Sequence, residues 1–214
     1  MLTIEKTVLP SPQQWDIIVE GMRNPMNSWD KMDSAMAWCD PLLQSVSFKL
    51  GDADHGLMTK LANGGAVHAK YRRMIPVWVT INAPLYWWKE FDTYKVGTVC
   101  NSCSTMHKIH SKEFAMGDFS SEHLNYWNKM WLKRTIKRLN EYRLLFVENF
   151  DKDDWWQLIQ MLPTSYNQKR TVMLNYEVLV NIYKWRRNHK LDEWHTFCDW
   201  IEGLPYADLI TGGE

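Results

Sequence analysis

The chain has 214 residues, of which 25 are basic and 25 acidic, so its formal net charge at pH 7 is zero. Balanced charge excludes the strong field that would steer a whole protein onto nucleic acid or an anionic membrane. No Pro/Gly/Ser-rich linker divides the chain, and this length suits one buried core. We therefore expect one domain, residues 1–214, with small-molecule or protein partners, no direct nucleic-acid partner and no membrane partner.

The first helix signal is Ser11-Pro12, which combines an N-cap with a first-turn proline, and Asn24-Pro25 should end that helix. Residues 24–54 mix helical stretches with turn formers and stay unassigned. Residues 54–61 are typical of a short helix, closed by the glycines of Asn63-Gly64-Gly65.

Residues 75–82 alternate between apolar and polar side chains and form the clearest predicted strand. Ala83-Pro84 ends this strand, and Pro84 can open a helix over residues 85–95. Arg72-Arg73 precede the strand directly. Because a strand entrance often borders a pocket, these arginines stay open between contact with a ligand phosphate and a solvated face.

The C-terminal half predicts helices over residues 121–149, 154–161, 171–188 and 192–203. On the third of them, Arg186 and His189 fall on the apolar face, which also carries Leu179, Ile182 and Trp185. One interpretation is a binding helix, since a buried guanidinium needs a partner or a ligand. The other is a helix end, where cations suit the dipole and reach water.

Cys100 and Cys103, followed by His107 and His110, raise two further hypotheses. A zinc site needs two ligand pairs that are usually separated by a dozen residues or more, so this spacing is tight. Cys39 and Cys198 are conceivable replacement ligands, and we assign no metal ligands. A cysteine nucleophile would need a lowered thiol pKa and an orienting partner, which the sequence does not identify. Four cysteines in this length also favour a reducing compartment.

Several blocks resemble, in order, the motifs of the flavin-dependent thymidylate synthases. In that family a G-H-x-x-x-x-E-H segment leads into a strand ending in A-P, and the R-H-R-x7-S signature follows. Here His68 takes the place of the G-H histidine, and Ala83-Pro84 matches the strand end. Asn101 to Ser104 lie where the family has N-E-x-S.

The last block carries the most specific resemblance. After Leu162-Pro163, the spacing of Asn175, Asn181 and Arg186 reproduces the family's two asparagines and arginine, six and five residues apart. His189 falls within one residue of a flavin-contacting histidine.

The sequence also departs from the family pattern. Tyr94-Lys95-Val96 stands in place of R-H-R, and Ser102 and Met106 stand in place of the Glu and Arg of N-E-x-S-x-R. A lysine lacks the bidentate fork by which arginine holds a phosphate. Lys95 and Lys108 could compensate in part.

Two further substitutions rearrange charge within the blocks. Arg73 replaces the Glu of E-H, and Glu177 replaces the Arg of N-x-R. A different cofactor pose, a different pyrimidine nucleotide or a loss of chemistry would each be compatible with these changes.

The resemblance implies an α+β fold: a single domain with a small antiparallel sheet flanked by helices. It implies an enzyme that transfers a one-carbon unit from methylenetetrahydrofolate to carbon 5 of a pyrimidine deoxynucleotide, dUMP above all. Reduced FAD would supply the hydride and NADPH would reduce the flavin. The product could be methylated or hydroxymethylated, as a virus or phage with altered DNA would require. A homotetramer in the cytoplasm, or in the host cytoplasm for a viral protein, is also implied.

The resemblance assigns roles to individual residues. Arg186 would polarise the uracil carbonyl, and Ser104 with Lys95 or Lys108 would bind the nucleotide phosphate; we regard Arg186 and Ser104 as the catalytic candidates. The flavin-binding candidates are His68, Asn101, Asn175, Asn181 and His189. The alternative is a nucleotide-binding or assembly protein that keeps the fold without flavin chemistry.

Overall fold

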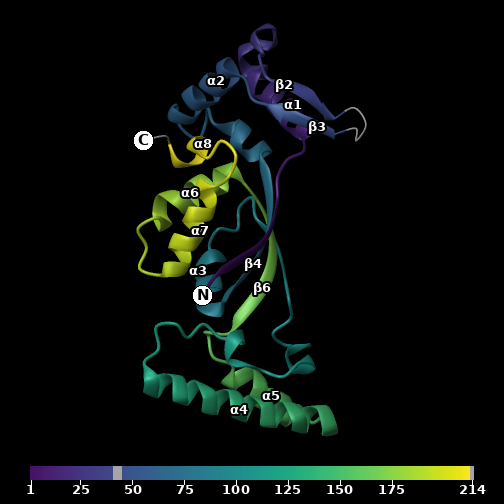
Figure 1. Cartoon of the computed structure of the whole chain (residues 1–214), viewed down its shortest axis with the longest axis vertical. Helices are drawn as coiled ribbons and strands as arrows, with labels where there is room; N and C mark the ends of the chain where they lie inside the picture. Colours follow the sequence, from purple (N-terminus) through teal and green to yellow (C-terminus); the bar gives the residue numbers. More distant parts are fainter. Residues whose placement is uncertain (41–44, 213–214) are drawn as a thin grey trace. The chain divides into compact units, whose positions relative to one another are not determined.

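The computed structural model describes residues 1–40 and 45–212 and shows a mixed α+β fold (Figure 1). Its helices and strands are β1 (Thr3–Val8), α1 (Pro12–Arg23), β2 (Ala35–Asp40), β3 (Ser45–Lys49), α2 (Asp52–Asn63), β4 (Pro76–Pro84), α3 (Leu85–Phe91), β5 (Val99–Ser102), α4 (Tyr126–Asn149), α5 (Lys152–Met161), β6 (Asn167–Asn175), α6 (Tyr176–Arg186), α7 (Asp192–Glu202) and α8 (Asp208–Thr211). Within the described ranges, no helix combines the length and apolarity needed to cross a membrane.

The strands form two small sheets. Four of them pair in the order β1-β4-β6-β5, and β2 pairs with β3 in an antiparallel hairpin. In β4, every second side chain is buried, from Val77 through Val79 and Ile81 to Ala83. This period-two pattern is the one that predicted the strand, so that prediction is confirmed.

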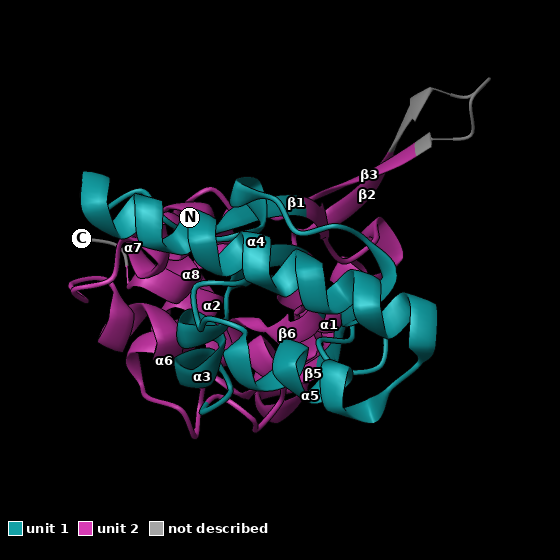
Figure 2. Cartoon of the chain, turned by 90° about the horizontal axis from the view of Figure 1, so that it is seen from below, with its two compact units in different colours: residues 1–5, 80–93, 100–171 teal, residues 6–79, 94–99, 172–214 magenta. Residues whose placement is uncertain are grey.

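The chain divides into two compact units, each made of several segments (Figure 2). Unit 1 comprises residues 1–5, 80–93 and 100–171, and unit 2 comprises residues 6–79, 94–99 and 172–214. Strands β4 and β6 each contribute residues to both units. The expectation of one domain over residues 1–214 stays a prediction.

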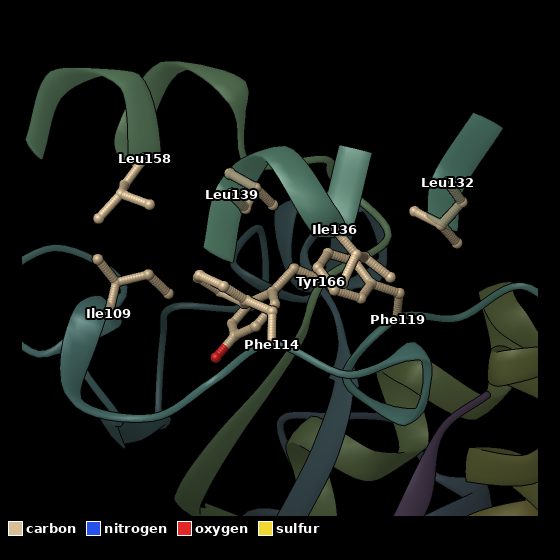
Figure 3. Packing of buried hydrophobic residues seen from close by; sticks show 8 residues of the cluster. All are labelled: Ile109, Phe114, Phe119, Leu132, Ile136, Leu139, Leu158 and Tyr166. Atoms are coloured by element: carbon tan, nitrogen blue, oxygen red, sulfur yellow. The ribbon is translucent and has the colours of Figure 1, made fainter. Parts of the chain in front are cut away.

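Unit 1 has its own hydrophobic core beneath helices α4 and α5, which lie side by side (Figures 1 and 3). Leu132, Ile136 and Leu139 of α4 recur at helical spacing and point into this core. The rings of Phe119 and Tyr166 meet edge to face with centroids 5.5 Å apart. Helix α4 begins at Tyr126, later than expected, because the Asn125 side chain accepts a hydrogen bond from the Asn128 amide and caps it there.

Unit 2 packs α1 against the β2–β3 hairpin and packs α6 against α7 and α8. Ser11 caps α1 as predicted, with a reciprocal hydrogen bond to Gln14, and the helix ends at Arg23. The unassigned residues 24–54 contain the hairpin. The sequence did not predict these strands, because each is short and a short strand shows few positions that alternate between apolar and polar side chains.

The expected helix over residues 171–188 was wrong at both ends. Residues up to Asn175 belong to strand β6, and helix α6 begins at Tyr176 and ends at Arg186. The side chain of Asn175 accepts a hydrogen bond from the Val178 amide at 3.1 Å, so this asparagine is the N-cap and not part of the helix face. Trp185, expected on the apolar face, is 67% exposed.

Candidate functional site

Arg73 and Asn175, both singled out in the sequence, line one pocket of unit 2, of about 350 Å³. We call it the Asn175 pocket. The segment before and at the start of β4, the loop before β5 and the end of β6 supply its walls. Its lining residues are Arg73, Met74, Pro76, Gly97, Thr98, Val99, Met173 and Asn175.

Asn175 lines this pocket at the point where β6 ends and α6 begins. The Tyr176 amide, next in the chain, donates to the Ile75 carbonyl at 3.1 Å and fixes the strand end. Gly97 has φ +79°, and a Cβ there would lie 3.1 Å from Asn175 Nδ2 and 3.2 Å from Val178 Cγ2. Only glycine therefore lets the loop approach the start of α6 this closely.

Thr98 gives the pocket an unsatisfied hydroxyl. Its Oγ1 is buried and has no hydrogen-bond partner among the described residues. A buried hydroxyl without a partner costs free energy that a ligand atom or a water molecule can recover. Arg73 is the charged side chain in the lining and is exposed, while Met74 and Met173 supply apolar surface. Apolar walls with a few polar groups are typical of small-molecule sites.

His68 lines a neighbouring pocket of about 430 Å³, which we call the His68 pocket. Met74 belongs to the lining of both this pocket and the Asn175 pocket. Tyr71 also lines the His68 pocket and donates its hydroxyl to the Met58 carbonyl at 2.9 Å. Burial raises the pKa of Tyr71 to about 12, so the phenol is neutral at pH 7.

Arg186, the last residue of α6, is enclosed by two aromatic rings. Its Nε donates to the Tyr94 hydroxyl at 2.8 Å, and its Cζ lies 4.8 Å from the ring centroid of Trp194 and 5.6 Å from that of Tyr94. Cation–π contacts of this kind fix the guanidinium in one orientation. Neither interpretation of the sequence pattern anticipated Tyr94 as its partner.

The other candidates of unit 2 lie around this helix. His189 follows α6, its Nδ1 accepts from the Leu191 amide at 3.2 Å, and its ring centroid is 6.3 Å from that of Trp194. Asn181 is on the exposed face of α6, and Lys95 is exposed. The structure thus brings His189 and Arg186 to the same tryptophan and leaves Asn181 and Lys95 facing outward.

Unit 1 contains the remaining candidates, Asn101, Ser104 and Lys108, all of them exposed. Ser104 Oγ accepts hydrogen bonds from the amides of Met106 at 3.2 Å and His107 at 2.8 Å. The hydroxyl proton stays available for donation to a phosphate oxygen. Because Cys103, the preceding residue, pairs with β6 through the Lys169 carbonyl at 3.0 Å, the start of this turn is fixed.

The cysteine hypotheses gain no support from the structure. Partial burial raises the pKa of the Cys100 thiol, the opposite of what a nucleophile needs. Across residues 1–40 and 45–212, no group of three or more His, Cys, Asp or Glu side chains could hold a metal ion. The side chain of Cys39, a conceivable replacement ligand, lies outside the described residues.

Sequence reasoning missed Gly97, Thr98 and Met173 as lining residues. Gly97 follows directly on the segment that replaces R-H-R, and a glycine after Lys95-Val96 was an available turn signal. Met173 could not be placed because the local pattern predicts a helix where β6 ends. Of the two arginines that precede the strand, Arg73 lines the Asn175 pocket and Arg72 lines a third pocket, and their role as ligand contacts stays a prediction.

Compared with known proteins, the chain matches no family model and no curated sequence. Among solved structures it is similar to the flavin-dependent thymidylate synthase ThyX from Helicobacter pylori complexed with FAD and dUMP. That comparison has a TM-score of 0.65 and 15% identity, and covers 98% of this chain and 96% of the other. A second structure of Helicobacter pylori ThyX with FAD and dUMP gives a TM-score of 0.65 at 16% identity, with 99% and 96% covered. The expected likeness to this family is therefore confirmed at the level of the fold.

Proposed function

We propose that this chain is a divergent flavin-dependent thymidylate synthase-like enzyme that transfers a one-carbon unit from methylenetetrahydrofolate to carbon 5 of dUMP. The observation that carries the proposal is the Asn175 pocket, where the asparagine that matches the family spacing lies in one cavity with the loop that follows the R-H-R position and with the start of β4. The fold neighbour was solved with FAD and dUMP and matches nearly the whole chain. NADPH as reductant and a homotetramer are parts of the same proposal.

The residues of the Asn175 pocket fit a flat, partly polar ring such as that of FAD. The unpaired Thr98 hydroxyl and the Asn175 amide offer hydrogen bonds, while Met74, Pro76 and Met173 offer apolar contact. Bound there, FAD would supply the hydride. In this proposal His68, which lines the neighbouring pocket with Met74, is a flavin contact, and Asn101, Asn181 and His189 are kept as flavin contacts from the resemblance alone.

Arg186 acts in this proposal on the nucleotide base. Its guanidinium is held by the Tyr94 hydroxyl and by the ring of Trp194, so its orientation is fixed before substrate binds. A fixed cation at the uracil carbonyl would stabilise negative charge on the carbonyl oxygen, that is, the enolate form of the ring in which carbon 5 is nucleophilic toward the one-carbon unit. Electrostatics and positioning then replace an enzymic cysteine nucleophile.

The phosphate of the nucleotide is assigned to Ser104 with Lys95 or Lys108. Ser104 has its hydroxyl proton to donate, and both lysines are exposed and free to turn toward an anion. Lysine binds phosphate as a point charge and not as a fork. We therefore expect weaker nucleotide binding than an arginine clamp would give.

One observation favours a second function. Tyr94 stands where the family signature has its first arginine, and it engages Arg186 directly. An Arg186 occupied in this way could serve nucleotide binding without catalysis, which suits a nucleotide-binding or assembly protein that keeps the fold.

Visible spectroscopy separates the two functions. The purified chain is mixed with FAD, with and without dUMP, desalted and scanned for a flavin band. A bound flavin band at one equivalent supports the enzyme, and its absence at saturating FAD contradicts it. Tritium release from dUMP labelled at carbon 5, with methylenetetrahydrofolate and NADPH, then measures turnover.

Variants assign the chemistry. Arg186→Ala should lower turnover by about 10²-fold or more, the usual cost of removing a positioned electrostatic group. Arg138→Ala is the matched control, because Arg138 is exposed in unit 1 and pairs with Glu141. Full turnover in Arg186→Ala would remove this residue from the mechanism.

A further inference from the structure

A third pocket of unit 2, of about 770 Å³, shares no lining residue with the Asn175 or His68 pockets. We call it the Arg72 pocket. The end of α2, helices α6 to α8 and the turn before β4 supply its walls. The lining residues that matter for its chemistry are Arg72, Val180, Lys184, Arg187, Glu202 and Ile210.

Arg72 is a buried cation whose hydrogen bonds are incomplete. Its side chain is 8% exposed, and its Nε has no hydrogen-bond partner among the described residues. Its carboxylate neighbour is Glu177, whose Oε2 lies 3.9 Å from Arg72 Nη1 and makes no hydrogen bond itself within the described chain. At that distance the charges attract without a hydrogen bond. A guanidinium in this state is poised to bind a further anion.

The charged side chains that line the Arg72 pocket are three cations, Arg72, Lys184 and Arg187, and one carboxylate, Glu202. Lys184 is exposed at the wall. Arg187 pairs with Asp199 at 2.9 Å and with Glu202 at 3.1 Å, and Glu202 also accepts from the Tyr183 hydroxyl at 2.7 Å. Glu202, the carboxylate in the lining, is therefore already bonded to Arg187 and Tyr183, whereas Arg72 Nε has no hydrogen-bond partner among the described residues and Lys184 is exposed.

We propose that the Arg72 pocket binds the phosphate group of a small phosphate ester. A guanidinium offers a planar fork that matches two phosphate oxygens, and Lys184 adds a point charge. Val180 and Ile210 give apolar surface for the organic part of such a ligand. This site is separate from the proposed flavin and dUMP site and does not depend on it.

Phosphorus and arginine NMR on the full chain test the proposal. Inorganic phosphate, dUMP and AMP are titrated in turn at constant ionic strength, with citrate as the carboxylate comparison. Saturable binding should shift the Arg72 Nε–H signal, assigned by its loss in Arg72→Gln. Tighter binding of AMP or dUMP than of phosphate identifies an organic ester, and equal affinities identify free phosphate as the ligand. Citrate binding more tightly than every phosphate compound would overturn the phosphate assignment.

Three variants complete the test. Arg72→Gln should weaken phosphate binding by at least tenfold, and Lys184→Ala by several-fold. Lys133→Ala removes the same charge from the exposed surface of α4 and should change nothing. If Arg72→Gln fails to fold, Lys184→Ala decides alone: unchanged affinity in that variant overturns the proposal. An Arg72 signal that does not move at saturating phosphate overturns it as well. FAD binding should be the same in all three.

Discussion

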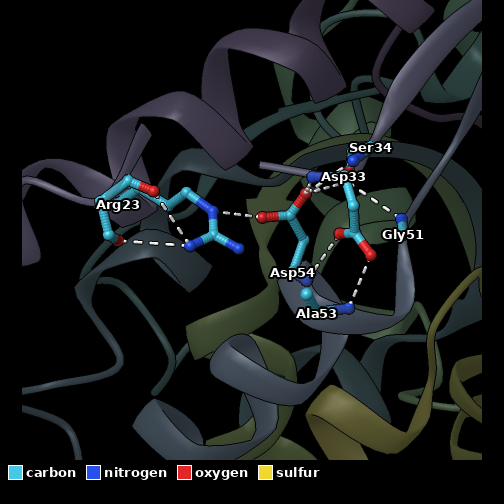
Figure 4. Close-up of polar contacts among 7 residues, drawn as sticks. Arg23, Asp33, Ser34, Gly51, Ala53 and Asp54 are labelled. Atoms are coloured by element: carbon cyan, nitrogen blue, oxygen red, sulfur yellow. Dashed lines mark hydrogen bonds and ion pairs between the residues drawn. The ribbon is translucent and has the colours of Figure 1, made fainter. Parts of the chain in front are cut away.

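Unit 2 contains two buried arginines with opposite surroundings, Arg23 at the end of α1 and Arg72 in the turn before β4. Arg23 Nε donates to Asp54, and its Nη1 reaches the Ser28 carbonyl and hydroxyl, both at 3.2 Å (Figure 4). Arg72 has an unbonded Nε and a carboxylate at 3.9 Å. The protein thus supplies hydrogen-bond partners for Arg23 Nε and Nη1, and we call Arg23 and its partners the closed network. Arg72 Nε has no such partner among the described residues, and we call Arg72 the open arginine.

The hydrogen-bond network around Arg23 extends through the carboxylate of Asp54 to that of Asp33. Asp54 Oδ2 accepts from the Asp33 amide at 3.0 Å and from the Ser34 amide at 2.8 Å, and it also accepts from the Ser34 hydroxyl. Asp33 in turn accepts from the Ala53 amide at 2.8 Å and the Asp54 amide at 3.0 Å (Figure 4). A hydrogen-bonded network of this kind favours a single conformation. Here it connects the residues just before β2 with the start of α2, a contact that we call the join between β2 and α2.

The comparison distinguishes buried polar groups that stabilise the fold from buried polar groups that are available to bind a ligand. Among the described side chains of unit 2, the buried polar atoms without partners are Arg72 Nε, Thr98 Oγ1 and Glu177 Oε2. Arg72 and Thr98 each line a pocket. Two of these three residues thus lie at cavities and the third, Glu177, is the carboxylate neighbour of Arg72, while the carboxylates at the join between β2 and α2 are hydrogen-bonded.

Removing the carboxylate of the closed network should have the largest effect on stability. Asp54→Ala leaves Arg23 buried without a counter-charge, which costs about 3–5 kcal/mol. Asp52→Ala in the first turn of the same helix is the control and should cost no more than about 1 kcal/mol. Urea unfolding followed by circular dichroism measures both. Equal losses would show that the network is not what stabilises this join.

Two glycines test how tightly the same join is packed. A Cβ on Gly51 would lie 2.2 Å from Asp33 Cγ, so Gly51→Ala should cost about 1–3 kcal/mol through overpacking. A Cβ on Gly56, in the middle of α2, would meet no atom within 4 Å. Gly56→Ala should therefore stabilise the protein by about 0.5–1 kcal/mol. A rise in stability for both variants would contradict the described packing.

Replacing Arg72, the open arginine, should change the free energy of unfolding only slightly. Arg72→Met removes a cation whose Nε–H makes no hydrogen bond and whose carboxylate neighbour, Glu177, is at 3.9 Å and partly exposed, so the free energy of unfolding should change by about 1 kcal/mol or less. Arg23→Met is the matched variant and should be clearly worse, since it leaves Asp54 buried without its arginine. The difference between the two, from thermal unfolding, tests the comparison itself. Losses of similar size would make Arg72 a structural residue.

Acid should weaken the closed network in a defined pH window. The Ala53 amide donates to Asp33 and lowers the pKa of that carboxyl below its usual value. The carboxylate therefore contributes stability that is complete above the unfolded pKa of about 3.9 and is lost as pH falls through the lower folded pKa. The stability difference between wild type and Asp33→Asn should hold from about pH 7 to 5 and shrink below about pH 4. A difference that persists undiminished at pH 2 would contradict this coupling.

The strongest local patterns predicted the fold well. The alternation in β4, the cap at Ser11 and the helical spacing of α4 all correspond to observed elements. Strand β6 was missed because Lys169, Arg170 and Thr171 interrupt its alternation, and the strand is held by pairing with β4 and β5, which local sequence does not encode.

The sequence predicted those lining residues of the candidate site that belong to a motif with a characteristic spacing. It did not predict the residues that loops bring to the site. Asn175 was found from its distance to Asn181 and Arg186, yet its role as N-cap depends on where α6 begins. Thr98 and the Tyr94 contact to Arg186 follow from tertiary approach between segments far apart in sequence. No local pattern marks such approaches.

The central claim is that the open polar groups of the Asn175 pocket bind a flavin. The most direct measurement is FAD titration of the wild type and of Thr98→Val, read by flavin absorbance and fluorescence. We predict one equivalent of FAD bound by the wild type, binding at least several-fold weaker in Thr98→Val, and no loss of stability in the variant, since its hydroxyl has no partner among the described residues. No flavin bound by wild type at saturating FAD, or equal affinity in a folded Thr98→Val, would contradict the claim.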